Sequence, residues 1–230
     1  MGIKSFVAVA TTAIVFAVSA SAAPLSGLFE IDIYNYESGG KSSNAAATVD
    51  NVAGRSGDFV GTIIYDGALF LRSDTRGGAA GGTPLITQFL DTGTGSYSVD
   101  NGDISGLFLS SGGGSGDPKF GTTTLFDIVA ISLDMPYRGA FEGVIHHDDG
   151  MTLLEDGAVV AGYSKPTSER KTNYMFGGGD FRLVYTSANG DPSLLEVHAS
   201  PVAPVPLPAP ALMLLTACGA LGWAARRRKT

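Results

Sequence analysis

The sequence predicts an all-β body, folded as a sandwich or a barrel, between two distinctive ends. Thirty-two of the 230 residues are glycine, and these glycines, together with Ser, Thr and Asp, separate short apolar runs. Such spacing is typical of many short strands joined by turns. No helical periodicity of useful length occurs outside the two ends. About 180 residues remain between the ends, which suits a single domain.

The first half of the body is expected to contain three strands and long polar loops. Alternating apolar residues predict an opening strand over residues 28–34. Further strands are expected over residues 59–65 and 104–109, with a turn at Asp66-Gly67. Stretches rich in Gly, Ala, Ser or Asn are expected to be loops, at residues 38–57, 74–82 and 110–116.

The second half is predicted to be richer in strands. Asp149-Gly150 and Asp156-Gly157 are expected to form hairpin turns, because Asp and Gly tolerate the positive φ that such turns require. The predicted strands cover residues 123–133, 141–146, 151–154, 159–160, 174–176, 181–185 and 194–197.

The N-terminal end has the three parts of a cleavable secretory signal, predicted over residues 1–22. Lys4 provides the positive charge, residues 6–18 are uncharged, and Ala20-Ser21-Ala22 has the small residues that a signal peptidase recognises. The alternative is a first transmembrane helix, but the apolar run is short for a span of about 20 residues. We therefore expect the body, residues 23–203, to be exported.

The C-terminal end combines prolines, an apolar segment and basic residues. Residues 211–225 carry no charge, and four basic residues follow at 226–229. Fifteen helical residues cover about 22 Å, which is less than a hydrocarbon core of about 30 Å. The basic residues should remain in the cytoplasm, so the precursor would cross the inner membrane once with its body outside.

This tail resembles a known protein-sorting signal, the VPLPA variant of the PEP-CTERM family. The resemblance rests on Val205, Pro206, Leu207, Pro208 and Ala209, followed by the apolar segment and the basic cluster, and it covers residues 204–230. It implies processing by an exosortase, a membrane enzyme thought to cut near the Pro motif. The alternative is an ordinary C-terminal membrane anchor.

Charge and cysteine content restrict the function classes. Between the two ends lie ten basic and 22 acidic residues, a net charge of −12. Such a body would be repelled by nucleic acid, whereas its charge is compatible with divalent cations. The one cysteine, Cys218, lies in the tail, so the body has neither a disulfide nor a Cys nucleophile.

The middle of the second half resembles the protective-antigen-type β-sandwich domain, the PA-fourteen fold. The similar segments are the strand, Asp-Asp-Gly, strand, Asp-Gly pattern of residues 141–157, the strand of residues 179–185 and the closing residues 189–195. The match is best over residues 139–198. It implies that the body is a β-sandwich of jelly-roll type.

In sugar-binding members of that family, paired aspartates hold a Ca²⁺ ion that binds glycan hydroxyls. The matching residues are Asp148 and Asp149, with His147 at the edge of the site and Asn189 on the later loop. Relatives often carry Glu or Asn directly after the Tyr of the late strand, where this chain has Thr186. Two interpretations stay open: a Ca²⁺ or glycan site, or an ordinary Asp-Asp-Gly turn.

The sequence therefore predicts a secreted or cell-surface protein that holds extracellular glycan through Ca²⁺. Its processing partners would be signal peptidase and exosortase. The alternative is a structural matrix component that binds no ligand. No Gly-x-Ser-x-Gly motif or zinc signature is present, and we expect no enzymatic activity.

Overall fold

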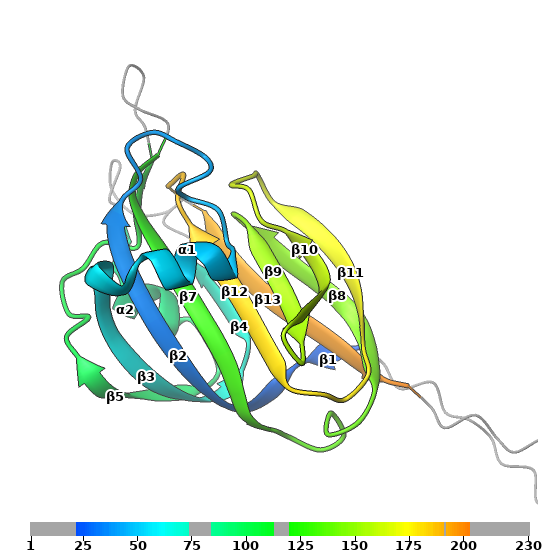
Figure 1. Cartoon of the computed structure of the whole chain (residues 1–230). Coiled ribbons are helices and arrows are strands. Elements are labelled where there is room, and N and C mark those ends of the chain that lie inside the picture. Colours follow the sequence, from blue (N-terminus) through cyan, green and yellow to red (C-terminus); the bar gives the residue numbers. More distant parts are fainter. Residues whose placement is uncertain (1–21, 74–83, 113–119, 191, 203–230) are drawn as a thin grey trace, which may run out of the picture. The chain divides into compact units, whose positions relative to one another are not determined.

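The computed structural model describes residues 22–73, 84–112, 120–190 and 192–202 of the chain. Within these residues the body is two stacked β-sheets, as predicted, and every strand pair is antiparallel. Figure 1 shows the strands of the two sheets and two short helices. The β-sandwich expectation is thus confirmed.

The small sheet has the order β1-β13-β8-β11, and β4 also pairs with β13. The large sheet has the order β10-β9-β12-β7-β2-β3-β5, and β6 also pairs with β7. The small sheet consists of β1 (Ala23–Pro24), β4 (Phe70–Ser73), β8 (Phe141–Asp148), β11 (Arg170–Phe176) and β13 (Ser193–Pro201). The large sheet consists of β2 (Ser26–Glu37), β3 (Phe59–Ala68), β5 (Ser96–Gly102), β6 (Ser110–Gly112), β7 (Phe120–Leu133), β9 (Met151–Glu155), β10 (Ala158–Tyr163) and β12 (Phe181–Ser187).

The main core lies between the facing surfaces of the two sheets. Successive strand residues point to opposite faces, so alternate apolar residues of each strand enter this layer. Phe29, Ile31 and Ile33 of β2 do so, and none has exposed surface. Three aromatic rings, those of Phe89, Phe126 and Tyr185, pack together in the core with centroids 5.6–5.9 Å apart.

Two short helices, which periodicity did not predict, contribute to the packing. The first, α1 (Val49–Gly54), lies in a segment expected to be a loop. It crosses the outer face of the large sheet (Figure 1), where Val52 belongs to a hydrophobic cluster that includes Tyr36 and Val184. The second, α2 (Ile86–Asp91), adds Phe89 and Leu90 to the core. Each has only six residues, too few for a period of 3.6 to be detected.

Most predicted strands are present and longer than expected, but several local predictions are wrong. The first three residues of the predicted loop at 110–116 form the strand β6, which pairs with β7. Residues 104–109 form no strand, and Phe108 makes only an isolated bridge to Leu85. Asp66-Gly67 is not a turn, because both residues lie inside β3 and pair with β2. An ideal Cβ on Gly67 would lie 2.3 Å from the Cα of Gly95, so this glycine permits a close backbone approach.

The two ends of the described body lie together. Ala23 of β1 pairs with Ala199 near the end of β13. The loops before α1, after β10 and after β12 gather at the other end of the sandwich (Figure 1). Apart from Ala22, the predicted signal peptide lies outside the described residues, and so do the predicted loop at 74–82 and the sorting tail at 204–230. Among the helices of the described residues, none has the length and apolarity needed to cross a membrane.

Candidate functional site

The candidate site lies where the chain passes from β8 to β9. The expected hairpin turn at Asp149-Gly150 is wrong, because β8 belongs to the small sheet and β9 to the large sheet. The two residues instead form a corner between the sheets. The corner is held beside the end of β12, since Asp149 N donates to the Thr186 carbonyl at 3.3 Å and Thr186 N donates to the Gly150 carbonyl at 3.0 Å.

Asp149 points into the protein and joins three segments. Its side chain has no exposed surface. Oδ1 accepts the N–H of Thr167 at 3.1 Å, and Oδ2 accepts those of Ala188 at 2.7 Å and Asn189 at 3.0 Å. Burial raises the pKa of this carboxyl to about 7, although the three N–H groups act to lower it. Asp149 therefore fixes the loops after β10 and β12 against the corner.

His147 supports the same corner from inside the sandwich. It has no exposed surface. Its Nδ1 lies 2.6 Å from the Asp149 carbonyl oxygen, and its Nε2 lies 2.8 Å from Oγ1 of Thr172. Because a carbonyl only accepts, Nδ1 carries the proton and Nε2 accepts from the hydroxyl in the neutral ring. Burial lowers the pKa of His147, which favours that neutral form.

Asp148 lies on the outer face of the small sheet, unlike His147. Its main-chain carbonyl accepts the Tyr185 hydroxyl at 2.5 Å, and its carboxyl lines a small hollow. The hollow has a volume of about 70 Å³. An internal cavity of about 150 Å³ holds one benzene ring, so this space has room for a cation with a water but not for a sugar ring. Its walls are formed by Arg72, Ser73, Asp148, Glu169, Pro192, Ser193 and Leu194.

Asn189 lies beside Asp149 on the loop after β12. Its side chain is exposed, and Nδ2 donates to the Thr167 carbonyl at 3.3 Å. Buried serines support this loop, because Ser187 Oγ lies 3.0 Å from Ser110 Oγ and 2.5 Å from Ser193 Oγ. The four predicted residues are thus neighbours, with Asp148 at the hollow, Asn189 at the surface, and His147 and Asp149 inside.

The hollow has the donor chemistry that Ca²⁺ prefers. Asp148, Glu169, Ser73 and Ser193 are among its lining residues, and all four have oxygen donors in their side chains. Arg72 is the one cationic side chain on its wall. In the described part of the chain, no group of three or more His, Cys, Asp or Glu side chains is placed so that it could hold a metal ion.

Several of these wall residues could not be found from the sequence. Ser73 and Arg72 come from β4, and Glu169 directly precedes β11, so they are far from the Asp-Asp-Gly motif along the chain. They meet Asp148 because β13 pairs with β4 on one side and β8 on the other. No local motif marks such a set.

Comparison with known proteins gives little further information. No protein-family model matches the chain, and no curated protein matches it. One similar solved structure is described as a PA14 sugar-binding domain from an RTX adhesin, with 18% identity and a TM-score of 0.44, covering 77% of this chain and 99% of that one. Another is the PA14 domain of the MpAFP antifreeze protein, with 15% identity and a TM-score of 0.43, covering 84% of this chain and 100% of that one.

Proposed function

We propose that this chain is an exported domain that binds extracellular glycan through a Ca²⁺ ion at the corner between β8 and β9. The observation that carries the proposal is the oxygen-lined hollow at Asp148. In this arrangement Asp148 and Glu169 contact the ion, and Asn189 lies at the surface where a sugar hydroxyl would approach. The sugar covers the mouth of the hollow, because the hollow itself is too small for a ring.

The rigid surroundings of the hollow support this assignment. Asp149, His147 and Tyr185 hold the corner in place through buried hydrogen bonds. A site that is fixed before the ligand arrives loses less conformational entropy on binding. Asp149 already accepts three N–H groups, and a carboxylate has about four lone-pair sites, so its main role is to position Asp148.

The competing proposal is a structural matrix component without a ligand. It is favoured by the same three hydrogen bonds, since they give Asp149 a purely structural task. In that case Asp148 and Asp149 are only corner residues, and the acidic surface serves solubility.

Calorimetric titration of the purified full-length protein with Ca²⁺ separates the two proposals. We expect one-to-one binding and a rise in melting temperature. Asp148→Asn should weaken Ca²⁺ binding at least about tenfold, because it removes a charged oxygen ligand. Glu142→Gln is the matched control, since Glu142 is exposed on the same strand. A glycan array with and without chelator then identifies the sugar class.

Absence of both binding heat and a thermal shift would leave the structural proposal. Glycan binding that persists in chelator would show that the ion does not bridge protein and sugar. Equal Ca²⁺ affinity in Asp148→Asn and the unchanged protein would place the ion elsewhere.

We also propose that residues 1–22 direct export and that an exosortase recognises Val205–Pro206–Leu207–Pro208–Ala209. The mature body then acts in the extracellular matrix or at the cell surface, with no enzymatic activity. Mass spectrometry of the mature protein should find an N-terminus at Ala23 and a C-terminus near residues 205–209. A mature chain that still ends at Thr230 would indicate a permanent anchor instead.

A further inference from the structure

Three side chains of the metal-binding types meet on the outer face of the small sheet, and none of them lines the nearby hollow at Asp148. We call His146, Glu196 and His198 the His–Glu–His cluster. The Nδ1 atom of His146 lies 3.8 Å from Oε2 of Glu196. The Nε2 atom of His198 lies 3.6 Å from the same oxygen. The two imidazole rings have centroids 5.4 Å apart. One carboxylate oxygen thus lies between two ring nitrogens.

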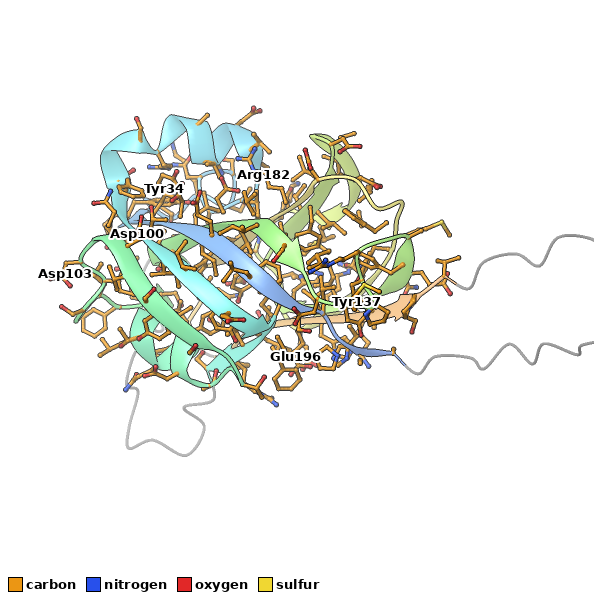
Figure 2. All side chains as sticks on the ribbon, turned by 90° about the horizontal axis from the view of Figure 1, so that it is seen from below. Tyr34, Asp100, Asp103, Tyr137, Arg182 and Glu196 are labelled. Atoms are coloured by element: carbon orange, nitrogen blue, oxygen red, sulfur yellow. The ribbon has the colours of Figure 1, made fainter. Side chains whose placement is uncertain are left out.

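Strand register explains this arrangement. His146 of β8 is directly opposite Glu196 of β13. His198 lies two residues beyond Glu196, so it points to the same face. The three side chains are therefore a cross-strand pair and its diagonal neighbour, which are within contact distance for long side chains. Figure 2 shows Glu196 on the side of the molecule away from Tyr34 and Arg182, which lie on the outer face of the large sheet.

Two of the three donor separations are close to those around a bound zinc ion. Zinc holds nitrogen and oxygen ligands at about 2.0–2.1 Å, so neighbouring donors of a tetrahedral site are about 3.3 Å apart. The two nitrogen–oxygen separations in the cluster exceed this by only a few tenths of an ångström. Small rotations of the side chains would close that gap. In their present positions, no three His, Cys, Asp or Glu side chains of the described residues form a group that could hold a metal ion, so binding requires these rotations.

Neighbouring side chains hold the carboxylate of Glu196 in place. The other oxygen of Glu196, Oε1, lies 3.8 Å from Nη1 of Arg72, which orients the carboxylate as outer partners of metal ligands do. The ring of Phe70 packs edge-on against His198, with centroids 6.2 Å apart. Lys171 pairs opposite His146, and Glu169 lies near it. The positive charges of Arg72 and Lys171 thus balance the negative charges of Glu169 and Glu196.

Accessibility also suits a metal. The side chains are 20% exposed for His146, 24% for His198 and 11% for Glu196, so an ion can enter from solvent.

We propose that His146 Nδ1, Glu196 Oε2 and His198 Nε2 bind one transition-metal ion of the zinc type, with the remaining coordination position open to water. Two imidazoles and one carboxylate suit Zn²⁺, Cu²⁺ or Ni²⁺, whereas Ca²⁺ prefers oxygen ligands alone. The site is thus distinct in chemistry from the Ca²⁺ site proposed at Asp148, and it does not depend on it.

Calorimetric titration of the full-length protein with Zn²⁺ at pH 7.5 tests the proposal. We expect one-to-one binding, with affinity reduced at least about tenfold in His146→Gln, Glu196→Gln and His198→Gln. Glu142→Gln, an exposed carboxylate on the same strand, should bind Zn²⁺ as the unchanged protein does. Asp148→Asn should also leave Zn²⁺ affinity unchanged, while it weakens Ca²⁺ binding.

A Cu²⁺ probe gives a readout that does not depend on the stability of the variants. Electron paramagnetic resonance should show hyperfine coupling to two imidazole nitrogens in the unchanged protein and to one in each histidine variant. The proposal is overturned if no Zn²⁺ binds, if the spectrum shows fewer than two nitrogens, or if Asp148→Asn abolishes Zn²⁺ binding while His198→Gln does not.

Discussion

Asp149→Ala is expected to lower the free energy of unfolding by about 4 kcal/mol at pH 5. The substitution leaves three main-chain donors, on Thr167, Ala188 and Asn189, without their acceptor. An unsatisfied buried donor costs about 1–3 kcal/mol, and some relaxation of the loops reduces the sum. Chemical unfolding in urea measures the effect.

The same substitution should cost less at high pH. The folded-state pKa of Asp149 is about 7, well above the 3.8 of an unperturbed aspartate. The folded state therefore binds the proton more tightly, and stability falls as pH rises from 3.8 to about 7. Between pH 5 and pH 8 the cost of Asp149→Ala should decrease by about 2–3 kcal/mol. The lowered pKa of His147 makes stability rise with pH, which is the opposite effect. Both the unchanged protein and the Asp149→Ala variant contain His147, so this effect cancels when their free energies of unfolding are subtracted.

Asp134→Ala is the matched control, since Asp134 is an exposed loop aspartate. It should change the free energy of unfolding by less than about 0.5 kcal/mol at either pH. A cost for Asp149→Ala below about 1 kcal/mol at pH 5 would contradict the structural role of this carboxylate. A cost that grows with pH would contradict the raised pKa.

Strands that alternate between core and solvent could be predicted from the sequence. The run at residues 28–34 lies within β2, because its alternating pattern matches the one buried face of that strand. Asp156-Gly157 is the expected hairpin turn between β9 and β10, and both residues have positive φ, 49° and 79°. In these two places the residues that the local structure favours are also those that the fold needs, so the sequence pattern was sufficient.

Segments without an alternating apolar pattern could not be predicted. The edge strand β5 is largely exposed and polar, so it lacks such a pattern. Residues 104–109 are apolar enough to suggest a strand, yet Ile104 and Leu109 instead fill core positions from a loop. Burial of apolar side chains does not by itself require strand pairing.

The geometry of the two candidate sites depends on contacts between distant segments. Asp148 and Asp149 are adjacent in sequence, but they point in different directions because the chain changes sheets at Asp149. His146 and Glu196 are brought together only by the register of β8 with β13. A short motif can identify candidate ligands, but the partners that complete a site come from the sheet order.

Gly150→Ala is expected to lower the free energy of unfolding by about 3 kcal/mol and to abolish Ca²⁺ binding at the corner. An ideal Cβ on Gly150 would lie 2.2 Å from the Ser164 carbonyl oxygen and 3.0 Å from that of Lys165. Both contacts are with main chain, so no side-chain rotation can relieve them. The segment after β10 must move away from the corner.

That movement would disturb hydrogen bonds that link this segment to the loop before α1 and to β9. The Ser164 carbonyl accepts the N–H of Ala47 at 2.8 Å, and the Ala47 carbonyl accepts the Thr152 hydroxyl at 2.6 Å. The same shift would pull the N–H of Thr167 away from the Asp149 carboxylate that accepts it.

Gly139→Ala is the matched control, because nothing lies within 4 Å of its ideal Cβ. Urea unfolding and Ca²⁺ titration of both variants measure the two effects. Calcium affinity that survives in Gly150→Ala would show that binding does not depend on the packing of this corner.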